Sequence, residues 1–277
     1  LKAVPDQAHI LFVGDIYQLP SVGAGNVLND FIQSPYFKVE YLSDIFRQAK
    51  CSSIVSTAHS ILEGKRKLET PIIAPYGPMQ QEEDFHFIGV DTPEQCMPYL
   101  QDLCWKLLPQ WYHVNPVRDV QILAPMHRGA VGIEQINQTF QNYLGNSRRF
   151  LEVGAQKFFV GDKVIQLKNN YEKNIFNGDL GIIQAVDDEE QQLIVNFNDE
   201  EHILEKRDAL DLKLAYAISI HKSQGSEFPI VVIPLFTQHF VMLKRNLLYT
   251  AVTRGRKKVF IIGDPRAYSI AVRTLDS

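Results

Sequence analysis

Three segments near the end of the sequence decide its fold: FPIVVIPL (residues 228–235), KRNLLYTAVTRG (244–255) and KKVFIIGD (257–264). The first and third are apolar along almost their whole length instead of alternating with polar residues. Such runs are typical of strands buried on both faces. The middle segment predicts a helix. Strand, helix and strand in this order predict an α/β fold with a parallel sheet.

Similar segments occur in the first half of the chain. Strands are predicted at about 10–14, 85–90 and 120–125, and the first of these is expected to be buried on both faces. Helices are predicted near 26–33, after LSDIF up to Gly64, from Thr92 onward, and over VGIEQINQTFQNYL (131–144).

The pattern changes between residues 158 and 211, where short strands alternate with turn signals at Asn177–Asp179 and Asn198–Asp199. This predicts a small antiparallel barrel, inserted because the α/β pattern resumes afterwards. The expected organisation is a piece of one domain at 1–40, a second domain at 41–157 and 212–277, and the barrel at 158–211.

Composition sets outer limits on function. The chain has 277 residues, 45% of them hydrophobic, and a net charge of −4, which suits a globular protein without a global positive field. It has no apolar stretch of the roughly 20 residues that a membrane helix needs, and no signal peptide at its start. Because it also lacks an initiator Met, we expect a fragment of a longer protein. We expect that protein to be cytoplasmic and to have no membrane partner.

Basic and cysteine residues have ordinary interpretations. Basic clusters at 64–67, 147–149 and 254–258 are interpreted as solvated surface on charge alone. Cys51, Cys96 and Cys104 show no metal-ligand spacing, and the last two fall within an apolar periodicity. No zinc site or disulfide framework is expected, and no residues are assigned to a metal.

Polar residues follow the first predicted strand. Ligands of parallel sheets bind beyond the carboxyl ends of strands, where Asp15 and Gln18 are expected. Gln18 would donate to a phosphate oxygen or hold a water molecule. A turn residue bonded to backbone explains the same pattern equally well. Gly23 and Gly25 do not form a dinucleotide fingerprint, because the third glycine is missing.

Two arginines are candidates for phosphate contacts. Arg47 lies near a predicted helix start and Arg254 near a helix end. Converging guanidinium groups can neutralise a transferring phosphoryl group. The alternatives are an ion pair with Asp44 for Arg47, and compensation of the helix dipole for Arg254.

A third candidate segment is SIHKSQGSEFPIVVI, which precedes a buried strand. Ser219 and His221 are expected to alternate on an extended segment, facing one side and contacting nucleic-acid phosphates. Glu227 could accept hydrogen bonds from a ribose. A buried core histidine and an exposed glutamate are the alternatives.

The combination of motifs resembles superfamily 1 DNA helicases, most closely the RecD/TraA branch related to the exonuclease V alpha subunit. The motifs occur in the order VGDIYQLPSVGAGN, LSDIFRQ, ILAPMHRGAVGIEQIN, ISIHKSQGSEFPIVV and LLYTAVTRGRKKVFIIGD. The resemblance implies two RecA-like motor domains, the first only in part, and an SH3-like barrel.

The resemblance also implies a role for each matching residue. Gln18, Arg47 and Arg254 would be catalytic at the γ-phosphate of ATP, the arginines as fingers. Asp15, Phe46, Gly225 and Glu227 would contact the nucleotide. Ser219, His221 and Arg128 would touch single-stranded DNA. Movement from 5′ to 3′ and a role in DNA repair or recombination follow from the family alone.

The departures from the family pattern are as informative as the match. The chain contains no G-x-x-x-x-G-K-[ST] loop and no Asp-Glu pair ending a strand. In the family these motifs hold ATP and Mg²⁺ and precede VGDIYQLP. We therefore expect the C-terminal part of a helicase, inactive as an ATPase by itself. A non-catalytic module that binds single strands, or a scaffold subunit of an exonuclease V-like complex, remain alternatives.

Overall fold

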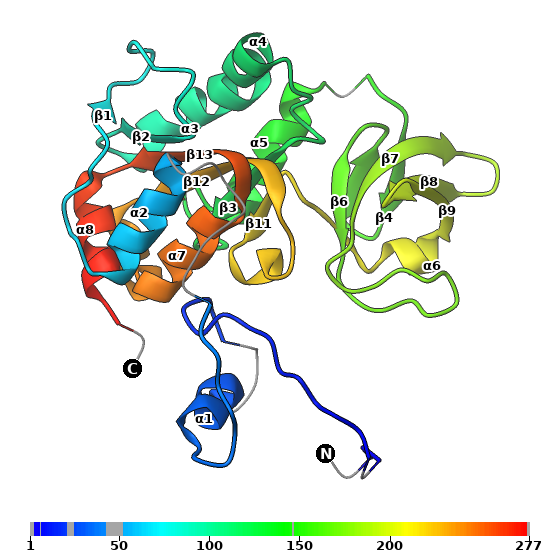
Figure 1. Cartoon of the computed structure of the whole chain (residues 1–277). Coiled ribbons are helices and arrows are strands. Elements are labelled where there is room, and N and C mark those ends of the chain that lie inside the picture. Colours follow the sequence, from blue (N-terminus) through cyan, green and yellow to red (C-terminus); the bar gives the residue numbers. More distant parts are fainter. Residues whose placement is uncertain (1–2, 6, 21–24, 43–51, 146, 276–277) are drawn as a thin grey trace.

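A six-stranded parallel sheet forms the centre of the molecule (Figure 1). The computed structural model describes residues 3–5, 7–20, 25–42, 52–145 and 147–275. Across the sheet the strands are β1 Ile72–Ile73, β2 Phe85–Gly89, β13 Gly255–Gly263, β12 Phe228–Leu235, β3 Val120–Ala124 and β11 Ala217–Ser219. Every pair of neighbours is parallel, which confirms the predicted α/β class.

Helices cover both faces of this sheet, as fully apolar strands require. In β13, Val259 and Ile261 belong to one core, whereas Phe260 and Ile262 belong to the other. The first core includes side chains of α2 Ser53–Leu62, α7 Arg245–Thr253 and α8 Pro265–Arg273. The second includes side chains of α3 Pro93–Asp102, the π-helical turn Leu103–Leu107, α4 Leu108–Tyr112 and α5 Ile133–Tyr143.

A five-stranded antiparallel sheet forms the separate lobe seen at the right of Figure 1. Its order is β10 Leu212–Leu214, β6 Lys163–Gln166, β7 Leu180–Asp187, β8 Gln192–Phe197 and β9 Glu200–Glu205. The turn between β8 and β9 lies at Asn198 and Asp199, whose φ angles are 51° and 66°, as predicted from their side chains. The short helix α6 Lys206–Ala209 follows β9, and a hairpin of β4 Phe150–Val153 and β5 Gln156–Phe159 precedes the sheet.

Buried polar side chains fasten this lobe to the parallel sheet. The carboxylate of Asp162, fully buried, accepts hydrogen bonds from Gln141 Nε2, Arg148 Nη1 and the Tyr216 hydroxyl. Asn137 of α5 donates to the carbonyls of Leu214 and Ala217, at distances of 3.0 Å each. Both connections between the lobes are therefore held by specific hydrogen bonds.

A buried lysine lies at the same junction. Lys163 is 4% exposed and its Nζ donates to the carbonyl oxygen of Val120 at 3.1 Å. Burial lowers the pKa of Lys163 to about 7, and the negative charge of Asp119 opposes this effect only in part. The neutral amine is therefore substantially populated in the folded chain near neutral pH.

This lysine makes stability depend on pH in a defined direction. Above pH 7 the folded chain releases the Lys163 proton while the unfolded chain keeps it, so the free energy of unfolding rises with pH. The slope approaches at most about 1.4 kcal/mol per pH unit. It holds up to about pH 8, because above this the thiols of Cys96 and Cys104, whose pKa burial raises, ionise in the unfolded chain first and oppose the rise. In Lys163→Met we expect this slope to vanish from urea-unfolding curves. An unchanged slope would contradict the assignment.

The N-terminal segment differs from its prediction. The strand expected at 10–14 is absent, and Ile10, Leu11, Phe12 and Val13 are 48%, 85%, 46% and 83% exposed. A strand of a parallel sheet needs neighbours that satisfy its backbone and helices that cover its side chains. Among the described residues no strand pairs with this segment. The helix predicted near 26–33 is confirmed as α1 Val27–Gln33.

The structure also tests the predictions for the cysteines, for one basic cluster and for membrane-spanning helices. Cys96 and Cys104 are buried core residues as expected, and Cys51 lies outside the described residues. The interpretation of the cluster 254–258 as solvated surface is wrong for Arg254, which is 5% exposed. In the described part of the chain, no helix has the length and apolarity needed to cross a membrane.

Candidate functional site

Asp15 organises the turn that carries Gln18. Its carboxylate accepts hydrogen bonds from the Tyr17 backbone N–H at 2.9 Å and from Gln18 Nε2 at 3.0 Å. A third donor, the Tyr249 hydroxyl, comes from α7 and lies 3.1 Å from the same carboxylate. The side chain of Gln18 is therefore held by Asp15, and the turn is attached to a helix far away in the sequence.

Leu19 anchors this turn to the body of the protein. Its backbone N–H donates to Thr250 Oγ1 at 2.9 Å, and its carbonyl accepts from Gln224 Nε2 at 2.6 Å. Its side chain is 8% exposed and belongs to the core that contains α7. Both backbone groups of Leu19 are thus satisfied by side chains from the C-terminal part of the chain.

The anchor predicts the effect of a conservative change. In Thr250→Val the Leu19 N–H loses its acceptor inside a buried site, and we expect the free energy of unfolding to fall by about 1–3 kcal/mol. Amide hydrogen exchange should accelerate at Leu19 and its neighbours, with α7 unaffected. Thr253→Val is a matched control, because the Thr253 hydroxyl donates only to carbonyls of its own helix. Unchanged exchange at Leu19 would contradict the anchor.

Arg254 lies at the end of α7, next to the start of β12. Its Nε donates to the Thr250 carbonyl at 3.3 Å and its Nη1 to the Ser226 carbonyl at 3.0 Å. Its own carbonyl accepts from the Phe228 N–H at 2.9 Å. These contacts fall on either side of Glu227, whose side chain is exposed. Arg254 and Glu227 are therefore neighbours, on the same side of the molecule as the Asp15 turn.

Tyr249 connects the Asp15 turn electrostatically to Arg254. Burial raises the pKa of the Tyr249 hydroxyl, and the adjacent Asp15 carboxylate adds to the effect by charge and hydrogen bonding. The positive charge of Arg254 acts in the opposite direction. Because it remains protonated at neutral pH, Tyr249 serves as a hydrogen-bond donor to Asp15.

A cleft of about 1020 Å³ lies between the carboxyl end of β3, the turn at Asn177–Asp179 and the segment after β11. Ser219, His221 and Gly225 all line it. Gly225 has φ +82°, a conformation that favours glycine, and a Cβ there would meet no atom within 4 Å. The cleft also receives Met126 from the loop after β3 and Val241 and Met242 from the 3-10 segment Thr237–Met242.

Two details of this cleft differ from the sequence interpretation. Ser219 ends β11, but His221 begins a 3-10 turn, His221–Ser223, so the two residues do not alternate on one extended strand. The 3-10 turn bends the chain, and both residues line the cleft nonetheless. The alternative of a core histidine is wrong, because His221 is exposed. Arg128 is exposed beside the cleft, but its neighbour His127 is the residue that lines it.

Sequence reasoning missed several side chains of the cleft, among them Lys222, Gln224 and Asn177. Lys222 Nζ donates to Asn177 Oδ1 at 3.2 Å, which links the segment after β11 to the antiparallel lobe. Gln224 lines the cleft and also donates to Leu19. The polar run HKSQG next to a glycine was a signal for Lys222 and Gln224. The sequence pattern around Asn177 predicts only a turn.

Two predicted residues, Phe46 and Arg47, lie outside the described residues, as does Asp44. Within the described ranges no group of three or more histidine, cysteine, aspartate or glutamate side chains could hold a metal ion. Of the predicted catalytic and nucleotide-binding residues, the structure thus brings together Asp15, Gln18, Glu227 and Arg254, while Gly225 lies in the cleft with Ser219 and His221.

Three family models match consecutive parts of the chain. They are described as an AAA domain for residues 1–81, an ATP-dependent RecD-like DNA helicase SH3 domain for 136–197, and a UvrD-like helicase C-terminal domain for 214–262. The ATP-dependent RecD2 DNA helicase of Deinococcus radiodurans is 32% identical over 98% of this chain and 35% of its own length. The chain belongs to the RecD-like helicases of superfamily 1.

Other RecD-like proteins support this membership. The RecBCD enzyme subunit RecD of Mycolicibacterium smegmatis is 28% identical over 95% of this chain and 46% of the subunit. The solved structure of a Pif1 helicase from Bacteroides in complex with ADP-AlF3 and single-stranded DNA aligns with 95% of this chain and 63% of its own, at 19% identity and a TM-score of 0.53. This likeness shows the fold: a RecA-like parallel sheet with an SH3-like insertion. The chain spans between a third and a half of the two RecD-like relatives.

Proposed function

We propose that this RecD-like chain is the C-terminal part of an ATP-dependent DNA helicase that moves 5′ to 3′ along a single strand in DNA repair or recombination. The observation that carries the proposal is the course of one segment, Ser219 to Phe228. It begins in the cleft that would hold DNA and ends beside Arg254. Because the segment is short, a displacement of its backbone on DNA binding would also move the residues beside Arg254.

The residues divide between two tasks in this proposal. Ser219, His221 and Lys222 would contact the phosphates of a single strand, with Arg128 beside the cleft. Such contacts position the strand without reading its sequence. Met126, Val241 and Met242 would offer apolar surface to the bases. Gln224 would connect DNA binding in the cleft to Gln18, because its amide donates to the carbonyl of Leu19, the residue next to Gln18.

The second task concerns the nucleotide. ATP would supply the free energy for movement, and Mg²⁺ would accompany its phosphates. Gln18 and Arg254 would meet the γ-phosphate, together with Arg47, and Glu227 would accept hydrogen bonds from the ribose. The guanidinium of Arg254 fits this role because its Nε and Nη1 are fixed by two carbonyls and its orientation is therefore preset. The phosphate cradle itself would come from preceding sequence, as would Mg²⁺ ligands.

The test compares this chain with the full-length gene product. ATP hydrolysis is measured with and without single-stranded DNA. We expect stimulated turnover from the full-length protein and none from residues 1–277, since phosphate binding needs the backbone cradle and lysine that this sequence lacks. Robust turnover by the chain alone would overturn the proposed division of the ATP site. A full-length protein without turnover, even with DNA, would overturn the motor function.

A second candidate is a non-catalytic subunit that binds single strands in an exonuclease V-like complex. The observation in its favour is that both lobes line the cleft, Asn177–Asp179 from the antiparallel lobe and Ser219 and His221 from the parallel-sheet lobe. Under either function the chain should bind single-stranded DNA weakly and lose affinity as salt increases. A phosphate-binding loop and an Asp-Glu strand end in the full-length sequence favour the motor, and their loss favours the subunit.

A further inference from the structure

A single carboxylate oxygen joins Gln18 to helix α7. Asp15 Oδ2 accepts hydrogen bonds from Gln18 Nε2 at 3.0 Å and from the Tyr249 hydroxyl at 3.1 Å. The other oxygen, Oδ1, accepts from the Tyr17 backbone N–H at 2.9 Å. Because a carboxylate only accepts hydrogen bonds, Gln18 must direct its amide nitrogen, and not its amide oxygen, toward Asp15. The carboxylate therefore fixes both the place and the orientation of the Gln18 amide.

Only its hydroxyl distinguishes Tyr249 from the apolar side chains around it. Tyr249 is 7% exposed and belongs to the core that contains side chains of α2, α7 and α8. Its ring meets the ring of Tyr17 edge-on, with the ring centres 6.3 Å apart. Phenylalanine would make the same ring contacts at position 249. The hydroxyl adds the hydrogen bond to Asp15, which packing of the ring does not require.

The helix that carries Tyr249 also carries Arg254, at its C-terminal end. Thr250, the residue after Tyr249, contacts both sides of the proposed ATP site. Its hydroxyl oxygen accepts from the Leu19 N–H at 2.9 Å, and its carbonyl accepts from Arg254 Nε at 3.3 Å. The turn with Gln18 and the guanidinium of Arg254 are thus both attached to two neighbouring residues of α7.

We propose that Tyr249 is a positioning residue for ATP hydrolysis, which sets the Gln18 amide relative to Arg254 through the Asp15 carboxylate. This inference rests on the function proposed above. The bond to Asp15 uses one hydrogen of Gln18 Nε2, so the second hydrogen and Oε1 can still meet a γ-phosphate oxygen or a water molecule. Tyr249 needs no contact with the nucleotide, because it acts through Asp15.

Loss of the Tyr249 hydroxyl would loosen this arrangement. Asp15 Oδ2 would keep only the bond from Gln18, and the carboxylate and the amide could then turn together. A displacement of about 1 Å at a group that meets the reacting atoms is enough to slow catalysis by up to about 100-fold. The alternative is a core tyrosine whose hydroxyl merely finds a partner. That role would affect stability, but its effect on turnover would not depend on Gln18.

The test measures DNA-stimulated ATP hydrolysis by the full-length protein. In Tyr249→Phe we expect kcat to fall about tenfold, with the KM for ATP within about twofold of the parent value. In the background of Gln18→Ala, which lowers kcat by itself, Tyr249→Phe should change kcat by less than about twofold. Such non-additivity is expected only if Tyr249 acts through Gln18.

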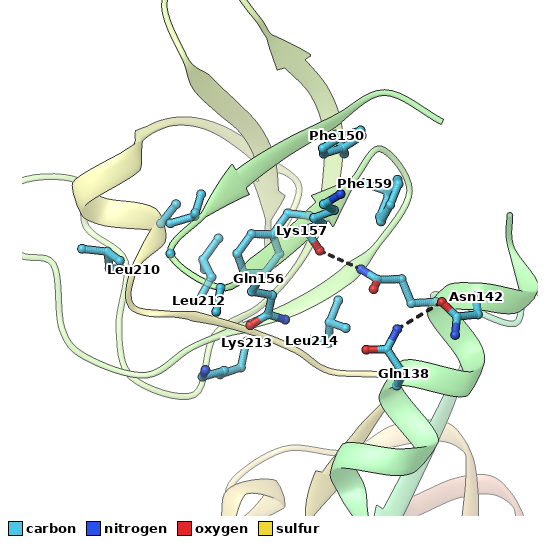
Figure 2. A pocket seen from close by; sticks show the side chains of 16 residues that line it. Gln138, Asn142, Phe150, Gln156, Lys157, Phe159, Leu210, Leu212, Lys213 and Leu214 are labelled. Atoms are coloured by element: carbon cyan, nitrogen blue, oxygen red, sulfur yellow. Dashed lines mark hydrogen bonds between the residues drawn. The ribbon is translucent and has the colours of Figure 1, made fainter. Parts of the chain in front are cut away.

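Gln138→Ala is the matched control background for Gln18→Ala. Gln138 is exposed on α5, and its Nε2 donates to Asn142 Oδ1 at 3.0 Å, drawn as a dashed line in Figure 2. The cavity that it lines shares no residue with the Asp15 turn or with the proposed DNA cleft. In this background Tyr249→Phe should still lower kcat about tenfold.

Tyr268→Phe is the control for the loss of a buried hydroxyl. Tyr268 lies on α8, is 1% exposed and belongs to the same core as Tyr249. Its kcat should stay within about twofold of the parent value. Urea unfolding of each variant shows whether a change in kcat merely follows a loss of stability.

A measurement without nucleotide tests the connection directly. In residues 1–277, NMR reports the two side-chain amide hydrogens of Gln18. We expect Tyr249→Phe to shift both signals and to speed their exchange with water, and Tyr268→Phe to leave them unchanged. The proposal is overturned if these signals do not respond to Tyr249→Phe, if kcat is unchanged or raised, or if kcat falls equally in the Gln18→Ala background. A full-length parent without turnover contradicts the proposed function instead, and the Gln18 signals still decide whether Tyr249 holds this amide.

Discussion

In the full-length protein, Arg254→Lys is expected to lower the DNA-stimulated rate of ATP hydrolysis by roughly a factor of 10³. Arg254 is 5% exposed and held by the carbonyls of Thr250 and Ser226. Lysine keeps the positive charge but has one donor group where arginine has a planar fork, so it cannot hold both carbonyls and also reach a phosphate. The loss should appear in kcat, with the KM for ATP changed much less.

Two further measurements separate this effect from misfolding. Lysine can satisfy at most part of the hydrogen bonding of Arg254, so we expect a stability loss of only about 1–2 kcal/mol, visible in urea unfolding. Affinity for single-stranded DNA should be unchanged. Arg256→Lys is the control, because Arg256 is exposed and close by in the sequence. A kcat for Arg254→Lys within a few-fold of the parent would mean that Arg254 only supports the fold.

Asp162→Ala is expected to reduce the free energy of unfolding by about 3–5 kcal/mol. Asp162 is fully buried and accepts from the Arg148 guanidinium at 2.9 Å, from the Tyr216 hydroxyl at 2.9 Å and from the Phe159 backbone N–H at 2.9 Å. Alanine leaves each of these donors in a site with little access to water. Loss of the carboxylate beside the Arg148 guanidinium, which is only 19% exposed, would lower the free energy of unfolding most, because it leaves a positive charge without its partner.

A second variant identifies the cause. In Asp162→Ala/Arg148→Met the unpaired charge is removed as well, and we expect the double variant to be more stable than Asp162→Ala alone. Asp188→Ala, on an exposed loop of the same lobe, should change stability by less than about 0.5 kcal/mol. If Asp162→Ala proved as mild as this control, the polar junction would contribute nothing to holding the two lobes together.

Local sequence chemistry predicted much of this fold, because some elements depend on few distant contacts. The turn at Asn198 and Asp199 follows from side chains that tolerate positive φ angles. The apolar runs that became β2, β3, β12 and β13 predicted strands correctly, since no other structure buries such short segments so fully. The same argument failed at Ile10–Val13, where the run is present but the described chain holds no partner strand for it.

The candidate site was only partly predictable for the same reason. Motifs identified Gln18, His221 and Arg254 one at a time. Their arrangement depends on contacts such as that between Leu19 and Thr250, which are 231 residues apart. The contribution of Asn177, and the presence of His127 in place of Arg128 in the cleft lining, have no local signal.

By itself the sequence determined the fold class, the barrel-like insertion, the turn positions and the family, because periodicity, turn chemistry and motif order are properties of neighbouring residues. Only the tertiary structure decided that Asp15 meets Tyr249, that Lys163 and Asp162 are buried between the lobes, and that Gln224 holds the carbonyl of Leu19. These features depend on which residues, distant in the sequence, come into contact when the chain packs. That outcome is set by the free energy of the whole chain and not by any single segment.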